Sequence, residues 1–135
     1  MGVASAFVLT SGGAHSIRRP LTNLHAKLTD DGIQVLSTTC VTATGGILYR
    51  CKHASSSTKT DMVFSIFLPS SYSIGASMSP TPAIYWLSGL TCTDENFCQK
   101  AGGSAFARAD SEGVAMIIPD TSPRGGDVPK ELKFS

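Results

Sequence analysis

The sequence has almost no excess of charge of either sign. Among its 135 residues, 11 Lys and Arg oppose 10 Asp and Glu, and the formal net charge is +1. These charges form no basic stripe and do not alternate with aromatic residues, as they do on surfaces that bind nucleic acid. We therefore expect no DNA or RNA partner.

Long apolar runs are missing as well. No run approaches the roughly 20 residues that a helix needs to cross a bilayer, so we expect a soluble chain without a membrane segment. Yet 41% of the residues are hydrophobic, which is enough for one domain of this length to bury a core. The sequence therefore predicts a folded domain and not a disordered chain.

Metal-binding spacing is absent too. The chain has 4 cysteines and 3 histidines but no C-x-x-C motif, and zinc sites usually take their ligands as close pairs. We expect no metal. Without a secretory signal, the thiols should stay reduced, and Cys40, Cys51 and Cys98 should be buried small hydrophobic side chains.

Residues 1–29 contain no Asp or Glu. This segment is rich in Ser, Ala, Thr and Gly and carries Arg18 and Arg19, a composition typical of a targeting leader or a poorly ordered terminus. An organellar transit peptide fits better than a secretory signal, because the short apolar run precedes the arginines. An ordinary flexible terminus is the alternative. We assign residues 1–32 to this leader and residues 33–135 to the folded part.

Strand patterns begin at Ile33. The many β-branched residues over 33–41 favour a strand there, and a second predicted strand covers 47–51. A third run, 61–68, places Met62, Phe64, Ile66 and Leu68 on one face, the period of a strand packed on a core.

The run Ala83–Leu87 is apolar at every position, which is typical of a central strand covered on both faces. A helix should follow with Thr93 as its N-cap and two acids in its first turn. Ser104 is predicted to cap a second helix that stops at Gly113, and residues 114–118 form another buried strand. This order predicts a βαβ crossover and a parallel central sheet.

The loop after residue 87 leaves the carboxyl end of that strand, where open α/β sheets place their binding chemistry. Gly89 lets the backbone approach a ligand without a Cβ in the way. The N–H groups of Leu90 and its neighbours would then be free to receive developing negative charge. The alternative is that Gly89 only makes a tight turn.

Two long segments, "YWLSGLTCTDENF" and "IIPDTSPRG", resemble the S-formylglutathione hydrolase family, also known as esterase D, and "GGILYRCKHASSSTKTDMVFSIFLP" is similar to that family's early sheet. The resemblance covers about residues 40–125. It implies an α/β fold, the amino-terminal portion of an α/β-hydrolase with a mixed β-sheet and helices. It also implies a serine esterase that hydrolyses S-formylglutathione to formate and glutathione in formaldehyde detoxification, and small esters as well, with no cofactor. A cytoplasmic location and a homodimer are further expectations.

The resemblance also implies roles for individual residues. One donor of the oxyanion hole is the backbone N–H of Leu90, and Gly89 lets the ligand come close to the backbone there. Cys92 should lie near the nucleophile, as a site of inhibition by thiol reagents; simple burial is the alternative. Trp86 should pack beneath the site. Arg124 borders the cleft or is a solvated turn cation.

What the sequence lacks most plainly is the nucleophile. It contains no G-x-S-x-G motif, and neither Ser88 nor Ser104 has the flanking glycines of a nucleophile elbow. His53 precedes the predicted central strand, which is the wrong chain order for the base. We therefore expect no catalytic residue here, because the serine, aspartate and histidine would lie downstream.

This departure leads us to interpret the chain as truncated: a shortened product, a partial gene model or a spliced form. We expect an inactive, marginally stable chain with an exposed edge at residues 114–118. The alternatives are a non-catalytic module that binds a partner chain and a fragment of a general carboxylesterase.

Overall fold

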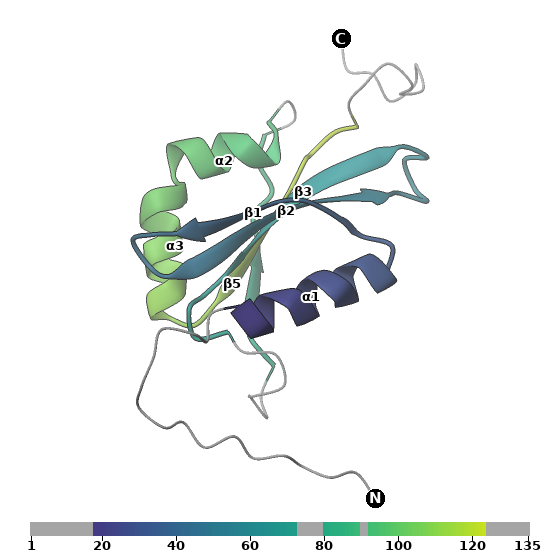
Figure 1. Cartoon of the computed structure of the whole chain (residues 1–135). Coiled ribbons are helices and arrows are strands. Elements are labelled where there is room, and N and C mark those ends of the chain that lie inside the picture. The colour runs from purple at the N-terminus through teal and green to yellow at the C-terminus, as the bar shows by residue number, and fades with distance from the viewer. Residues whose placement is uncertain (1–17, 73–79, 90–91, 124–135) are drawn as a thin grey trace, which may run out of the picture.

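A computed structural model describes residues 18–72, 80–89 and 92–123 of the chain (Figure 1). The elements follow in the order α1 (Arg18–Asp30), β1 (Gln34–Val41), β2 (Gly46–Ala54), β3 (Asp61–Leu68), β4 (Ala83–Tyr85), α2 (Asp94–Lys100), α3 (Gly102–Ser111) and β5 (Ala115–Pro119). The strands form a five-stranded sheet in the order β1-β2-β3-β5-β4. Helix α1 covers one face, and α2 and α3 cover the other (Figure 1).

The sheet is mixed, as the sequence predicts. Strands β1, β2 and β3 pair antiparallel in succession, and β3 pairs antiparallel with β5. Only the pair β4 and β5 is parallel within the described strands, and α2 and α3 connect the two as the predicted βαβ crossover. The expectation of a parallel central sheet is wrong beyond this pair, because the antiparallel strand β3 occupies the other side of β5.

Strand β3 has the predicted bounds, and its predicted faces are confirmed. Phe64, Ile66 and Leu68 belong to the core on the α1 side of the sheet. Phe67, of opposite parity, belongs to the core on the α2 and α3 side. The alternation of side chains along an extended strand explains this division.

The largest difference from the sequence-based expectation lies at β4. The apolar run over 83–87 predicts a central strand covered on both faces, but β4 is an edge strand of 3 residues. Tyr85 and Leu87 are 67% and 72% exposed. An apolar run reports composition and not the number of neighbouring strands, and the described part of the chain gives β4 one neighbour. The prediction that residues 114–118 form an exposed edge strand is also wrong, because β5 lies between β3 and β4 and pairs with both.

Two core clusters lie on opposite faces of the sheet. The cluster under α2 and α3 contains stacked and edge-to-face aromatic rings; its members are Phe67, Phe97, Phe106, Ala109, Met116 and Ile118. The buried residues on the α1 side are Tyr49, Cys51, Leu68 and Ala115. Because both faces bury apolar side chains, each strand of the sheet's centre contributes to both layers.

Helix α1 lies inside the segment that the sequence assigns to the leader, and the sequence pattern did not predict it. Leu24 and Leu28, one helical turn apart, pack against the core on the α1 side. The helix ends at a turn in which Gly32 has a φ of +77°, a conformation that glycine adopts without strain. Helix α1 is therefore packed on the sheet through these two leucines. The division at residue 32 and a transit peptide in 1–29 stay predictions, and residues 1–17 lie outside the described residues.

The start of α3 also differs from the expectation. The helix begins at Gly102 and not after a Ser104 cap, so Ser104 lies in the first turn. Gly102 is buried, and a Cβ there would lie 2.9 Å from the ring of Phe106, so close packing explains the glycine. Gly113, with a φ of +65°, follows the end of the helix as predicted. No helix within the described ranges is long and apolar enough to cross a bilayer.

The cysteines divide by position. Cys51 is buried, as predicted, and burial raises the pKa of its thiol to about 11. Cys98 is partly buried, and burial again raises its pKa. The expectation for Cys40 is wrong, because this residue lies on the edge strand β1, most of whose residues are exposed.

Candidate active-site loop

The candidate site lies at the carboxyl ends of the parallel strands β4 and β5. The loop that begins at Trp86 leaves β4, and residues 120–123 leave β5. The Trp86 N–H donates to the Ile117 carbonyl at 2.9 Å, which continues the pairing beyond β4. Since carboxyl ends of parallel strands meet at one edge of a sheet, the two loops lie side by side.

Gly89 sits at the centre of this contact. The Cys92 N–H donates to the Gly89 carbonyl at 2.8 Å and closes a turn. The Thr121 hydroxyl donates to the same carbonyl at 2.7 Å. A Cβ on Gly89 would meet the Cys92 Sγ at 3.8 Å, an ordinary contact, and its φ is not positive. The missing side chain therefore leaves the backbone open and does not relieve strain.

A shallow cleft of about 220 Å³ opens beside this turn. Its lining includes Ser88, Gly89 and Cys92 from the loop and Asn96, Phe97 and Lys100 from α2. The Trp86 ring lies against Phe97 with ring centroids 4.8 Å apart, but Trp86 remains 45% exposed. The prediction that Trp86 packs in the core beneath the site is therefore wrong: the ring contacts Phe97 but stays largely exposed at the surface of the cleft. The cleft brings the Gly89 backbone and the Cys92 thiol onto one surface.

Helix α2 begins where the sequence predicts, directly after the loop. Thr93 is the N-cap, and Asp94 and Glu95 lie in the first turn. The Thr93 N–H donates to the Asn96 Oδ1 at 2.7 Å, so the Asn96 side chain satisfies a backbone donor that the helix itself leaves unpaired. This cap marks the end of the loop and the start of α2.

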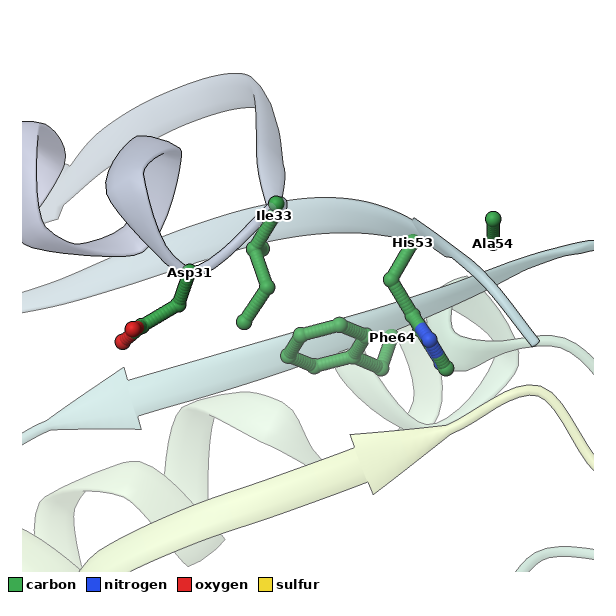
Figure 2. A pocket seen from close by; sticks show the side chains of 6 residues that line it. Asp31, Ile33, His53, Ala54 and Phe64 are labelled. Atoms are coloured by element: carbon green, nitrogen blue, oxygen red, sulfur yellow. The ribbon is translucent and has the colours of Figure 1, made fainter. Parts of the chain in front are cut away.

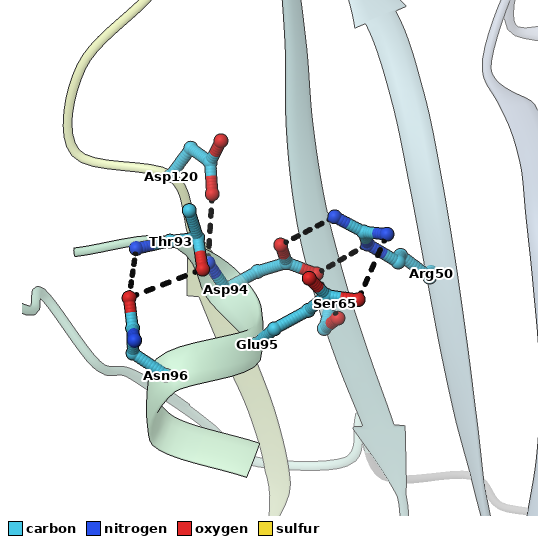
Figure 3. A network of polar contacts seen from close by, with 7 residues as sticks. All are labelled: Arg50, Ser65, Thr93, Asp94, Glu95, Asn96 and Asp120. Atoms are coloured by element: carbon cyan, nitrogen blue, oxygen red, sulfur yellow. Dashed lines mark hydrogen bonds and ion pairs between the residues drawn. The ribbon is translucent and has the colours of Figure 1, made fainter. Parts of the chain in front are cut away.

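The Asp94 carboxylate is fully buried at 0% exposure and is held by two strands (Figure 3). Arg50 of β2 donates from Nε to Oδ2 at 2.9 Å and from Nη2 to Oδ1 at 3.1 Å. The Ser65 hydroxyl of β3 donates to Oδ2 at 2.6 Å. The hydrogen bond to Asp94, with the nearby carboxylates, raises the pKa of Arg50 above its ordinary value. A buried charge requires such partners, because its transfer from water is costly.

Asp120 connects the same helix to β5. The Asp94 N–H donates to the Asp120 Oδ1 at 2.7 Å, and the Asp120 N–H donates to the Val63 carbonyl at 2.9 Å. Arg50 also forms an ion pair with the half-exposed Glu95 at 3.0 Å (Figure 3). The start of α2 is thus tied to β2, β3 and the end of β5, and this fixes one end of the candidate loop.

Several predicted residues lie elsewhere. Leu90 and Arg124 are outside the described residues. His53 lies on the α1 face in a groove of about 530 Å³ with Asp31 and Ile33, its ring 5.7 Å from that of Phe64 (Figure 2). His53 and Arg50 have opposite parity on β2 and therefore point to opposite faces.

The remaining predicted residues complete this comparison. Ser88 lines the cleft, whereas Ser104 belongs to α3. Within the described ranges, no group of three His, Cys, Asp or Glu residues is placed to hold a metal.

The contacts that Arg50, Ser65 and Thr121 make around the loop have no counterpart in the sequence-based prediction. Arg50 and Asp94 are 44 positions apart, and Thr121 and Gly89 are 32 positions apart. Local spacing cannot indicate such pairs. The one available signal was an acidic residue directly after a helix cap, which the dipole of the helix alone explains equally well.

A mixed sheet with helices on both faces, and a loop leaving the carboxyl end of a parallel strand, are features that the α/β-hydrolase fold shares with other α/β folds, and the solved structure described below gives the α/β-hydrolase assignment. Residues 55–135 match the family model described as "Putative esterase", and the chain belongs to this esterase family. The resemblance stated from the sequence is therefore confirmed at the level of the family.

Two relatives specify the resemblance further. Over 82 residues the chain is 50% identical to an S-formylglutathione hydrolase from Arabidopsis thaliana, a match that covers 61% of this chain and 27% of that protein. The solved structure of an S-formylglutathione hydrolase from Agrobacterium tumefaciens matches with a TM-score of 0.59 and 38% identity, over 71% of this chain and 32% of that one. The matches thus span between a quarter and a third of the length of these enzymes.

Proposed function

We propose that this chain supplies the oxyanion-binding loop of a serine esterase that hydrolyses S-formylglutathione to formate and glutathione. The observation that carries the proposal is the Gly89 turn, which lines a cleft at the carboxyl end of β4 and is held from β5 by Thr121. The identity to two S-formylglutathione hydrolases supports the choice of substrate. Simple carboxylic esters are proposed as further substrates.

In this proposal the Leu90 N–H donates to the oxygen that becomes negatively charged when the formyl carbon is attacked. Fixed backbone donors stabilise this charge without reorganising, and loss of one such donor typically lowers kcat by about 10²–10³. Gly89 has no Cβ, so the substrate can come close to the backbone of the loop. A thiol reagent on Cys92 would fill the cleft of about 220 Å³, so Cys92 is a site of inhibition and not the attacking group.

The attacking serine, its histidine and the aspartate are proposed to come from outside these 135 residues. The sequence contains no G-x-S-x-G motif, and His53 faces the α1 side of the sheet, away from the α2 face. We therefore propose that residues 1–135 alone do not turn over S-formylglutathione. Serine-based acyl transfer needs no cofactor. A cytoplasmic location, or an organellar one if 1–29 is a transit peptide, and a homodimer complete the proposal.

The exposed β4 edge favours a second candidate function, a non-catalytic module that binds a partner chain. Ile84, Tyr85 and Leu87 are 51%, 67% and 72% exposed, and β4 has one neighbour among the described strands. An apolar strand with an unpaired edge recruits another strand or aggregates. A general carboxylesterase is a third candidate that shares the fold. A stable, monodisperse chain that binds a partner without supporting turnover would favour the module.

A graft tests the proposed function. Residues 55–135 replace the corresponding segment of the Arabidopsis enzyme, and S-formylglutathione hydrolysis is measured for the chimera and for residues 1–135 alone. We expect turnover by the chimera and background rates for the isolated chain. A correctly folded chimera without turnover would contradict the proposal, and turnover by the isolated chain would contradict the absence of a nucleophile.

A further inference from the structure

We propose that Asn96 and Lys100 of α2 form a carboxylate-binding surface that recognises the glutathione part of the substrate. The inference rests on the proposed function and adds to it the residues that favour an anionic thioester over a neutral ester. Both side chains would bind a part of the substrate remote from the reacting carbonyl. They therefore determine specificity and not the chemical step.

The two residues belong to one face of α2. Asn96 and Lys100 are one helical turn apart, and side chains at this spacing lie next to each other on a helix. Both line the cleft of about 220 Å³, together with Phe97. The Trp86 ring lies against Phe97 with ring centroids 4.8 Å apart. One wall of the cleft thus carries two polar side chains beside an aromatic pair.

Lys100 is the one charged side chain among the described residues that line this cleft. It is exposed and forms no ion pair with any described residue. The acids in the first turn of α2 do not compete for it, because Asp94 and Glu95 both pair with Arg50, at 2.9 and 3.0 Å. The compact ammonium of a lysine is a mobile point charge, and here it is available to an anionic ligand.

Asn96 adds neutral donors in a fixed direction. Its Oδ1 accepts hydrogen bonds from the Thr93 N–H at 2.7 Å and from the Thr93 hydroxyl at 3.1 Å. The amide oxygen therefore faces the helix cap, and the Nδ2 faces away from it (Figure 3). An amide nitrogen has two N–H donors, and no residue in the described part of the chain accepts from them. These donors lie on the same helix face as the Lys100 ammonium.

A carboxylate of glutathione suits these donors in chemistry and in reach. Lys100 lies about 6 Å further along the helix axis than Asn96, since a helix rises about 1.5 Å per residue. Two residues of extended peptide span about 7 Å, so a peptide thioester bound beside the loop can extend a carboxylate along this face. Hydrogen bonds from an ammonium to a carboxylate are stronger than neutral ones. Simple esters carry no such group and gain nothing from the surface.

Kinetics of the grafted enzyme test this role, because residues 55–135 contain both side chains. In Lys100→Gln, KM for S-formylglutathione should rise about two- to fivefold, the range of an exposed ion pair, with kcat unchanged. KM for the neutral ester p-nitrophenyl acetate should not change. Lys100→Arg keeps the charge and should keep KM near that of the parent. Equal changes in KM for the two substrates, or no change for either, would overturn the inference.

Binding to the full 135-residue chain gives a readout that does not depend on turnover. The probe is S-methylglutathione, a stable thioether, which should shift the NMR signals of the Asn96 side-chain amide and the Lys100 backbone amide. Lys100→Gln should weaken its binding about two- to fivefold, and added salt should weaken binding more in the parent than in this variant. The diester of the probe lacks both carboxylates and should bind the two chains equally.

Asn96→Asp tests the second donor. The variant keeps an oxygen for the Thr93 N–H and replaces the Nδ2 donors by a carboxylate oxygen, so S-methylglutathione should bind more weakly than to Lys100→Gln. Lys27→Gln is the control with the same change of net charge as Lys100→Gln. Lys27 is exposed on α1, across the sheet from α2 (Figure 1), so this variant should bind the probe like the parent.

These measurements separate the inference from the proposed function. A folded chimera that hydrolyses neither substrate contradicts the proposed function, while binding of the probe still decides the role of Lys100. Equal binding of S-methylglutathione to the parent and to Lys100→Gln, or an equal loss in Lys27→Gln, would identify Lys100 as a solvated side chain without a ligand and would overturn the inference.

Discussion

Substitution of Arg50 by methionine removes the charged partner of the buried Asp94 carboxylate and keeps most of the aliphatic stem. Asp94 is fully buried and accepts two hydrogen bonds from Arg50 at 2.9 and 3.1 Å. After the substitution, the Ser65 hydroxyl and the start of α2 remain near the charge. An uncompensated buried carboxylate is the main cost.

The magnitude follows from the burial of the two partners. Breaking a buried ion pair costs roughly 3–5 kcal/mol. The Arg50 side chain is 33% exposed, so water screens part of the interaction and the lower value, about 3 kcal/mol, applies. For a folded unit of about 100 residues, each kcal/mol lowers Tm by roughly 4–8 °C. We therefore expect Tm to fall by roughly 12–24 °C.

Lys52→Met is the matched control. Lys52 lies on the same strand and the same face, and pairs with Asp61 at 2.9 Å, but Asp61 is 58% exposed. Exposed pairs contribute about 0–1 kcal/mol. Urea denaturation and thermal melts followed by circular dichroism give both free energies of unfolding. Equal losses for Arg50→Met and Lys52→Met would refute the account of a buried charge held by Arg50.

A double variant sharpens this test. The double variant combines Arg50→Met with Asp94→Asn, whose neutral amide carries no charge to be left unpaired. Its loss of stability should therefore be smaller than the sum of the losses of the two single variants. Additive losses would show that the two side chains do not interact in the folded chain.

Three further outcomes are expected. Gly46→Ala places a Cβ 2.7 Å from the Leu68 carbonyl oxygen and should lower the free energy of unfolding by about 1–3 kcal/mol or more. Gly103→Ala has open space around its Cβ, so its free energy of unfolding in urea denaturation should be unchanged or higher by about 0.5–1 kcal/mol. The pKa of Cys51 is raised from 9.0 to about 11 by burial, so the corresponding stability is fully present below pH 9.0 and is lost as pH rises to about 11, at roughly 1.4 kcal/mol per pH unit. Unfolding at a series of pH values, with a flatter slope for Cys51→Ala, checks this sign. Native-state labelling by a thiol reagent should modify the exposed Cys40 first and Cys51 only on unfolding; early labelling of Cys51 would contradict its burial.

Local patterns predicted those elements whose own residues determine them. The alternating apolar residues of β3 predicted its bounds and its faces. Side chains alternate between the two faces of a strand, so a shift by one residue would move every apolar side chain of the set to the other face. Thr93 and the following acids predicted the start of α2, since capping is a property of adjacent residues. Gly113 similarly marked the end of α3 through its left-handed conformation.

Features that depend on distant residues escaped prediction. The apolar run at β4 gave no information on strand order, so an edge strand was taken for a central one. Helix α1 has few apolar residues, and its formation depends on Leu24 and Leu28 meeting a sheet formed by later residues. The contact of Thr121 with Gly89 requires β5 to lie beside β4. Fold class and loop position were therefore predictable, whereas the groups that hold the loop were not.

The central claim is that the loop after β4 donates a backbone N–H to the oxyanion, and Leu90→Pro tests it most directly. Proline lacks the N–H, while Leu90→Ala keeps it and removes only the side chain. In the grafted enzyme, we predict that kcat for S-formylglutathione falls by about 10²–10³ in Leu90→Pro and stays within about threefold of the parent in Leu90→Ala. Equal kcat values in two variants of equal thermal stability would contradict the account.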